Sequence, residues 1–187
     1  DDRWDLRSRI PLDQRPVVFI GPYEHHSNEL PWRESIADVV TIREDRDGYI
    51  DLEQLRLELD RYADRPLRIG SFSAASNVTG MRSPTREIAK LLHAHDAYAC
   101  FDYAASAPYV EIDMNPAPDA AGGDASYDAV FLSPHKFLGG PGSSGVLVFN
   151  ERLDSRDLPP SVAGGGTVDY VSPHDQDFIA DIEEREK

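Results

Sequence analysis

Short apolar runs rich in β-branched residues recur along the 187-residue chain, and amphipathic stretches lie between them. A short apolar run that is bounded by turn-forming residues is typical of a strand buried in a sheet. The pattern predicts six such strands, at residues 17–20, 39–42, 67–72, 98–101, 129–132 and 145–149.

Two of the amphipathic stretches predict helices. Behind Asp51, a residue type that caps helix N-termini, apolar residues from Leu52 to Tyr62 recur at helical spacing. Ser83 and Pro84 predict the start of another helix, with Ser83 as its cap and Pro84 as its first residue. Strands that alternate with helices predict a layered α/β fold with a largely parallel sheet.

Composition and charge exclude several classes of protein. With 40% hydrophobic and 28% charged residues, the chain can bury a core and falls outside the disordered and fibrous classes. No apolar run approaches the roughly 18 residues that a membrane-spanning helix needs. The 34 acidic and 19 basic residues give a net charge of -15. This charge repels nucleic acid and anionic lipid, so we expect neither as a partner.

The N-terminal residues and the single cysteine bear on where the protein acts. The first residues lack the basic and apolar regions of a signal peptide. Cys100 can form no disulfide within the chain, which fits a reducing compartment. We therefore expect a cytoplasmic protein, in which Cys100 is a small buried hydrophobic residue.

The distribution of Pro, Gly and charge predicts one compact unit with extensions. We expect an N-terminal lead-in at residues 1–16 and a core at residues 17–153. Residues 154–187 begin as a Pro- and Gly-rich exit, and from Asp175 they have the pattern of an acidic helix. Because this helix pattern stops without an end signal, we expect the chain to be part of a longer protein.

Polar residues gather directly after four of the predicted strands. In open parallel sheets, ligands bind in the crevice beyond the carboxyl ends of the strands, so residues at these positions are candidates for a functional site. The candidates are His25, His26, Asn77, Asp102, Ser133, His135 and Lys136.

The residue types in this set point to one kind of chemistry. A lysine at a buried strand end can be desolvated, which lowers its pKa and frees the amine to form a Schiff base. Lys136 stands out because lysine is otherwise found only at positions 90 and 187. Asp102 could stay ionised beside a protonated pyridine nitrogen, and Ser133 and His135 could donate hydrogen bonds to a phosphate. Together these groups suit pyridoxal 5'-phosphate (PLP).

Each candidate also has an ordinary interpretation. Asp102 could cap a helix, Lys136 could be a surface charge, and either His25 or His26 could be a hydrogen-bonded structural histidine. A different class of function, a metal-dependent hydrolase, would use both of these histidines with Asp102 and His135. Adjacent histidines point apart on an extended segment, and the chain has no His-x-x-x-His spacing, so we disfavour the metal site.

Five blocks of sequence occur in a characteristic order and spacing. They are Glu24–Trp32, Ser76–Gly80, Phe101–Asp102, Ser133–Gly142 and Gly164–Gly166. In these blocks the chain resembles the class V aminotransferase-like, fold type I PLP enzymes, nearest the cysteine desulfurase and selenocysteine lyase group. The resemblance covers about residues 16–187. It implies a PLP-dependent transferase-like large domain, a three-layer sandwich with a mostly parallel central sheet.

The resemblance implies catalytic roles for two residues. Lys136 would form the Schiff base with PLP and later move protons at the α-carbon of the substrate. His25 would stack on the cofactor ring, whereas His26 would be structural.

The resemblance also implies contacts with the cofactor. Asn77 would contact the phenolic oxygen or the substrate carboxylate, and Asp102 would pair with the pyridine nitrogen. Ser133 and His135 would bind the phosphate. One position departs from the desulfurase pattern, because Ala105 occupies the place of a glutamine that reaches the phenolic oxygen.

The implied function is that of a PLP-dependent lyase or transferase acting on a small amino acid, either desulfurase-like or an aminotransferase, and working as a homodimer. Relatives are about twice as long. Ahead of the first strand they carry a phosphate-binding turn. Beyond the position of Lys187 they have a small C-terminal domain with an arginine for the substrate carboxylate and, in desulfurases, an acceptor cysteine. We cannot locate these groups here, and we expect residues 154–187 to lead toward such a C-terminal domain. We therefore expect this chain alone to bind PLP weakly and to be inactive. The alternative within the fold is a non-catalytic or excised PLP-fold domain.

Overall fold

The computed structural model describes residues 5–154, 158–160, 162–181, 184 and 185. The chain divides into two compact units, Asp1–Asn150 and Glu151–Lys187. The division falls slightly before the boundary that we expected at Asp154. All the residues predicted to bind a cofactor belong to the first unit.

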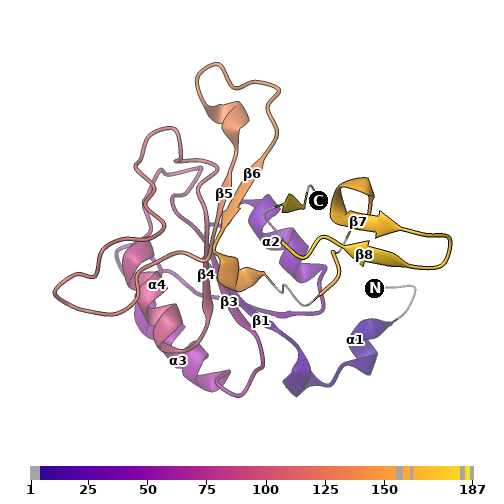
Figure 1. The fold of residues 1–187 in the computed structure, drawn as a ribbon. Coiled ribbons are helices and arrows are strands. Elements are labelled where there is room, and N and C mark those ends of the chain that lie inside the picture. The colour runs from indigo at the N-terminus through magenta and orange to yellow at the C-terminus, as the bar shows by residue number, and fades with distance from the viewer. Residues whose placement is uncertain (1–4, 155–157, 161, 182–183, 186–187) are drawn as a thin grey trace. The chain divides into compact units, whose positions relative to one another are not determined.

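A six-stranded sheet forms the centre of the first unit, with the strand order β2-β1-β3-β4-β5-β6 (Figure 1). The pairs within β1 to β5 are parallel, and β6 runs antiparallel to β5. The strands are β1 (Val17–Ile20), β2 (Asp38–Thr41), β3 (Arg68–Ser73), β4 (Tyr98–Asp102), β5 (Ala129–Leu132) and β6 (Val146–Phe149). The mostly parallel sheet predicted from the sequence is therefore confirmed.

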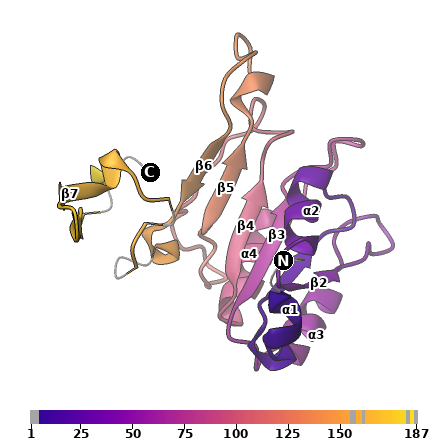
Figure 2. The ribbon, with the colours of Figure 1, turned by 90° about the vertical axis from the view of Figure 1, so that its right-hand side faces the viewer.

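Helices cover both faces of this sheet (Figures 1 and 2). Helices α3 (Leu52–Arg61) and α4 (Thr85–Ala94) pack on one face, and α2 (His26–Arg33) packs on the other. This arrangement confirms the expected three-layer α/β sandwich. Among the helices of the described residues, none has the length and apolar character needed to span a membrane.

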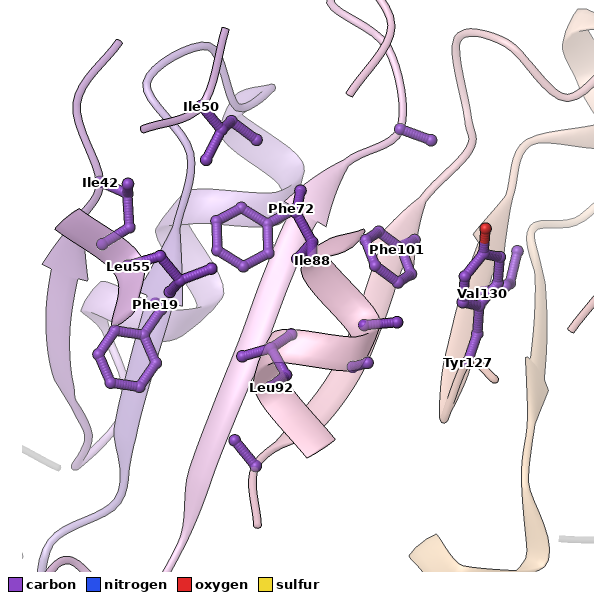
Figure 3. Close-up of a cluster of buried hydrophobic side chains, with 14 of the residues drawn as sticks. Phe19, Ile42, Ile50, Leu55, Phe72, Ile88, Leu92, Phe101, Tyr127 and Val130 are labelled. Carbon is purple, nitrogen blue, oxygen red and sulfur yellow. The ribbon is translucent and has the colours of Figure 1, made fainter. Parts of the chain in front are cut away.

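The main core lies between the sheet and helices α3 and α4 (Figure 3). The two-residue period of a strand directs Phe19, Phe72 and Phe101 to this face, where all three are fully buried. Leu55 of α3 and Leu92 of α4 are equally buried in the same cluster. Burial of each such side chain stabilises the fold by about 1.5–3 kcal/mol.

The opposite face of the sheet is partly polar. Val18 and Ile20 of β1 form a small apolar cluster there, against which Trp32 of α2 packs. The alternating residues Ser71 and Ser73 of β3 are buried on the same face. Small hydroxyl side chains thus lie beneath α2, where a parallel strand would ordinarily carry apolar ones.

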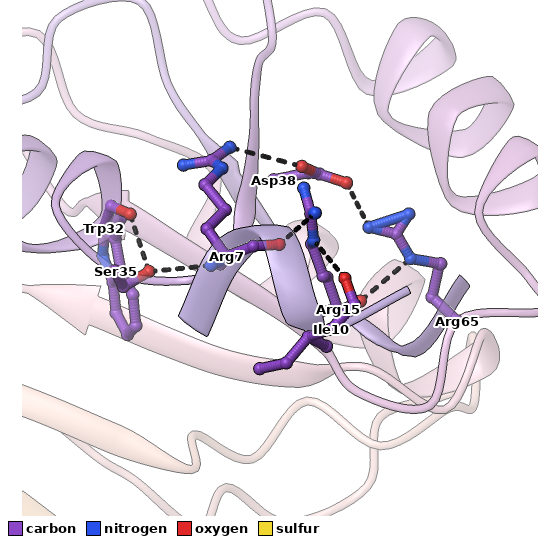
Figure 4. Close-up of polar contacts among 8 residues, drawn as sticks. Arg7, Ile10, Arg15, Trp32, Ser35, Asp38 and Arg65 are labelled. Atoms are coloured by element: carbon purple, nitrogen blue, oxygen red, sulfur yellow. Dashed lines mark hydrogen bonds and ion pairs between the residues drawn. The ribbon is translucent and has the colours of Figure 1, made fainter. Parts of the chain in front are cut away.

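The N-terminal segment is anchored at the end of the sheet where the parallel strands begin (Figure 4). It contains α1 (Leu6–Arg9) and a 3₁₀ turn, η1 (Leu12–Gln14). Asp38, the first residue of β2, forms ion pairs with Arg7 and Arg65. The Arg65 side chain also donates a hydrogen bond to the carbonyl of Arg15 at 2.9 Å. This segment therefore lies away from the carboxyl ends of the strands.

The two predicted helix starts differ in outcome. Asp51 caps α3 as expected, because its carboxylate accepts a hydrogen bond from the Gln54 N–H at 2.9 Å. The cap position of α4 is Pro84 rather than Ser83. The Ser83 hydroxyl instead donates to the carbonyl of Ser73 at 2.5 Å, so a tertiary contact replaces the expected cap.

Strand β6 differs from the other strands in its exposure. All four of its residues, Val146–Phe149, are exposed, whereas all four residues of β1 are buried. β6 lies at the end of the strand order, so it is paired along one edge only within the part of the chain that the structure describes.

The second unit contains a two-stranded antiparallel sheet of β7 (Val168–Val171) and β8 (Gln176–Phe178). The acidic helix that we expected from Asp175 is wrong at its start, since β8 occupies those residues. The Ser172 N–H donates to the Asp175 carbonyl at 2.7 Å, and this turn directs the chain back along β7. Residues 182, 183, 186 and 187 of the expected helix lie outside the described residues.

Candidate functional site

A cavity of about 430 Å³ lies at the carboxyl ends of β3, β4 and β5. Parallel strands end at the same edge of a sheet, so the residues that follow them meet there. The cavity is lined by all six residues predicted to bind the cofactor, His25, Asn77, Asp102, Ser133, His135 and Lys136. The structure therefore brings the set together, while the roles of its members stay predictions.

Asp102 is the last residue of β4 and lies half-buried in the cavity wall. Its Oδ1 accepts a hydrogen bond from the Ala104 N–H at 2.8 Å, which fixes the orientation of the carboxylate. No residue in the described part of the chain donates to its Oδ2. One carboxylate oxygen is thus held in place and the other can accept a hydrogen bond from a ligand.

His25 is the N-cap residue of α2, with an extended backbone. Its Nδ1 accepts a hydrogen bond from the Ser27 N–H at 3.2 Å and lies 3.0 Å from the Ser27 hydroxyl. An Nδ1 that accepts a backbone N–H leaves the ring proton on Nε2. His26 begins α2 with an exposed side chain and is not among the described residues that line the cavity. The capping contact therefore orients the exposed His25 side chain and favours the tautomer with the proton on Nε2.

Lys136 lies beyond β5, at the end of the 3₁₀ turn η2 (Pro134–Lys136). Its N–H donates to the Ser133 carbonyl at 2.9 Å, so the turn ties the lysine to the strand end. The Lys136 side chain is exposed, although we expected a buried lysine at a strand end. The reason is its position, because η2 carries the chain out of the sheet before Lys136 is reached.

Gly140 closes the turn that carries Lys136. Its N–H donates to the Phe137 carbonyl at 2.9 Å, and a Cβ at this position would lie 1.9 Å from the backbone oxygen of Pro134. A side chain here therefore requires the backbone of the turn to open.

We expect Gly140→Ala to lower the free energy of unfolding by about 1–3 kcal/mol, because backbone atoms cannot move aside as a flexible side chain can. Urea denaturation followed by circular dichroism measures this loss. The matched control is Gly145→Ala in the same loop, where a Cβ would make only an ordinary contact of 3.7 Å with the Leu132 carbonyl. Equal stability of the two variants would contradict the argument.

A half-buried carboxylate lies behind the cavity wall. Glu24 Oε1 accepts hydrogen bonds from the N–H groups of Gly21 at 3.1 Å and Ser73 at 2.9 Å. Its Oε2 accepts from the Ser73 hydroxyl at 2.6 Å and from the Asn28 amide at 2.7 Å. Burial, the largest influence, raises the pKa of Glu24 above its ordinary value, and these hydrogen bonds act in the opposite direction.

Sequence analysis did not single out Glu24, Asn28 or Ser73. An acidic residue in a loop after a strand is usually solvated, so Glu24 gave no signal by itself. The signal that could have found it is the pair of hydroxyl residues, Ser71 and Ser73, within an otherwise apolar strand. Buried hydroxyl groups need partners, and Asn28 of α2 and Glu24 in the loop before it supply them.

The residues of the alternative metal site do not form a ligand set. Within the described ranges of the chain, no three His, Cys, Asp or Glu side chains are grouped so that they could hold a metal ion. Asp102, His25 and His135 line the cavity from different elements. His26 is not among the described lining residues, although its ring centroid lies 5.9 Å from that of His25. The donor geometry therefore gives the hydrolase alternative no support.

Comparisons with known proteins identify similar sequences. The sequence profile of the aminotransferase class-V family matches residues 6–185. A probable cysteine desulfurase of Halalkalibacterium halodurans is 29% identical over 171 residues, which are 89% of this chain and 39% of that protein. A probable cysteine desulfurase of Mycobacterium leprae is 31% identical over 164 residues, 86% of this chain and 35% of that protein. The chain thus spans well under half of these relatives' lengths.

Solved structures show the same fold. A cysteine desulfurase of Escherichia coli superimposes with a TM-score of 0.73 at 24% identity, over 97% of this chain and 42% of that one. An alanine-glyoxylate aminotransferase of Nostoc gives a TM-score of 0.58 at 24% identity, over 79% of this chain and 37% of that one. At this identity the likeness establishes the fold.

Proposed function

Because the chain belongs to the class V aminotransferase family, we propose that it binds PLP through Lys136 and acts on a small amino acid in the manner of a cysteine desulfurase. Members of this family depend on PLP. The observation that carries the proposal is the single cavity that combines Lys136, Asp102 and the predicted phosphate-binding residues Ser133 and His135. The activity of the whole protein is part of the proposal, since the chain spans 39% of the first of these relatives.

The donor set of the cavity fits the cofactor. When PLP is joined to the amino group of a substrate, it withdraws electrons from the α-carbon of that substrate. Lys136 Nζ would hold the aldehyde carbon and then exchange a proton at the substrate α-carbon. Asp102 Oδ2 would hold a proton on the pyridine nitrogen, and Ser133 and His135 would donate hydrogen bonds to the phosphate. His25 would lie against the ring and exclude water from one face.

Ala105 bears on which reaction follows. It lines the same cavity as Asn77, and its methyl group donates no hydrogen bond. Asn77 would therefore contact the phenolic oxygen without the second amide of the desulfurase pattern. We infer that the chain acts on a small amino acid by desulfuration or by transamination, and product analysis separates the two.

The proposed setting follows from the same family resemblance. We infer a homodimer in the cytoplasm, a reducing compartment in which Cys100 stays a reduced thiol. Cys100 is buried in β4 and takes part in no disulfide, which supports a structural place for this thiol.

The test is covalent trapping of the cofactor. The protein is incubated with a large excess of PLP, reduced with borohydride and digested, and the modified peptide is identified by mass spectrometry. We expect the adduct on Lys136. A panel of small amino acids is then assayed with the full-length protein, because we expect this chain alone to be inactive, for release of sulfide, alanine or a keto acid. An adduct confined to Lys90 or Lys187 would overturn the proposed site, and PLP bound at Lys136 without any product would favour the non-catalytic alternative.

A further inference from the structure

We propose that Glu24 is a positioning residue, which holds His25 and two other residues of the cavity wall in place. This inference deepens the proposed function, and its cofactor measurements rest on that function. Glu24 itself is not among the described residues that line the cavity. It acts through the residues that it holds.

The contacts of Glu24 join three separate elements. Gly21 follows β1, Asn28 belongs to α2, and Ser73 ends β3, and all three donate hydrogen bonds to the one carboxylate. Asn28 and Ser73 also line the cavity. One side chain therefore fixes the first turn of α2 against the carboxyl ends of two strands.

The ionised form of Glu24 is the one that these contacts require. Four donors point at two oxygens, and only a carboxylate can accept from all four. No Lys, Arg or His in the described part of the chain forms an ion pair with Glu24, so hydrogen bonds alone compensate the buried charge. Such a group stabilises a fold weakly, because desolvation of the charge opposes its contacts. Its contribution is therefore to geometry.

The link from Glu24 to His25 is direct. His25 is the next residue, and its backbone leads into α2 as the N-cap. Asn28 lies in the same first turn and is held on its other side, where its Oδ1 accepts from the Ser71 hydroxyl at 2.7 Å. When Glu24 fixes Asn28, it also fixes the N–H of Ser27 that sets the tautomer of His25.

Gly21 gives independent support. A Cβ at Gly21 would lie 2.7 Å from Glu24 Oε1, closer than real Cβ contacts. The backbone at this position thus leaves room for the carboxylate. Gly21→Ala should displace Oε1 and disturb the same contacts without removing the charge.

The first measurement needs no cofactor. Two-bond proton–nitrogen correlation spectra of histidine side chains report the tautomer of each ring, and the His25→Gln spectrum assigns His25. In the unmodified protein we expect one tautomer of His25, with the proton on Nε2. In Glu24→Gln the amide oxygen accepts from at most two of the four donors, and its NH₂ group opposes the Asn28 amide. We expect His25 to show both tautomers in this variant.

The matched control is a buried carboxylate at the other end of the sheet. Asp128 is fully buried and accepts a hydrogen bond from the Ala99 N–H at 2.6 Å. Asp128→Asn should lower the melting temperature without altering the His25 tautomer. If the role of Glu24 were merely structural, Glu24→Gln would have the same two effects as Asp128→Asn. Glu24→Asp keeps the charge but shortens the side chain, so we expect it to resemble Glu24→Gln.

The second measurement is the dissociation constant for PLP, from spectroscopic titration. If misplacement of the cavity wall costs the binding free energy of one hydrogen bond, about 1.4 kcal/mol, PLP binds about tenfold more weakly. We expect this loss in Glu24→Gln and Gly21→Ala, and none in Asp128→Asn. Should Glu24→Gln fail to fold, Gly21→Ala supplies the same test.

The outcomes separate the two proposals. Suppose that the His25 tautomer changes in Glu24→Gln, but neither this variant nor the unmodified protein binds PLP. This result supports the positioning role and refutes the proposed function. If Glu24→Gln and Gly21→Ala show the same single His25 tautomer as Asp128→Asn and the unmodified protein, the positioning role is wrong. This conclusion holds whether or not PLP binds.

Discussion

Replacement of Lys136 by alanine is expected to abolish the visible absorption band that PLP gives with this protein, together with the borohydride-stable adduct. The band requires a double bond between the aldehyde carbon of PLP and the nitrogen of an amine. Lys136, which lines the cavity, would supply this nitrogen. The cavity keeps its other polar groups in this variant, so PLP can still bind there without attachment. Absorbance titration and mass spectrometry of the reduced protein measure the two losses.

The control for this prediction is Lys90→Ala. Lys90 lies in α4, where its Nζ is 2.7 and 2.6 Å from the two carboxylate oxygens of Asp119. An amino group that is held by both oxygens of a carboxylate is not free to attack an aldehyde. We expect this variant to keep the band. Persistence of the band in Lys136→Ala would show that another amine forms the Schiff base.

In the full-length protein, Asp102→Asn is expected to leave the adduct intact and to reduce turnover by about a hundredfold, the effect of losing an interaction of about 2.7 kcal/mol in the transition state. An amide cannot hold the proton on the pyridine nitrogen as a carboxylate does, so the ring withdraws electrons less strongly. The amide oxygen of this variant can still accept the hydrogen bond from the Ala104 N–H, which in the unmodified protein fixes Oδ1. The fold should therefore be preserved.

Turnover is measured as product release from the amino acid that the substrate panel identifies. Asp47→Asn serves as the control, because Asp47 is exposed in the turn before α3 and far along the chain from the cavity residues. Equal stability of the two variants with a loss of turnover only in Asp102→Asn is the expected result. Undiminished turnover in Asp102→Asn would exclude the pairing with the pyridine nitrogen.

The sequence predicted much of the fold because the signals were local. Apolar runs such as 17–20 and 129–132 became strands at the same residues. Asp51 became a helix cap because it hydrogen-bonds within its own first turn. The set of cavity residues was also predictable, since the carboxyl ends of parallel strands share one edge.

The errors concern contacts between residues far apart in sequence. Ser83 bonds to Ser73 across two elements, and nothing in its neighbourhood distinguishes this from a cap. The strand at Gln176–Phe178 depends on pairing with β7, whereas its acidic composition is equally compatible with a helix. Glu24 was not among the candidates because its contact with Ser73, 49 residues away, cannot be inferred from the residues around it.

The exposure of Val146–Phe149 in β6 has a consequence for the behaviour of this chain in solution. These four side chains leave between 41% and 54% of their surface to water, on a strand with one unpaired edge. An exposed apolar edge strand of this kind favours self-association, because a strand of another copy of the chain can pair with its free edge. The net charge of -15 keeps copies apart. Added salt screens that repulsion and leaves the apolar attraction intact, so colloidal stability should fall as ionic strength rises.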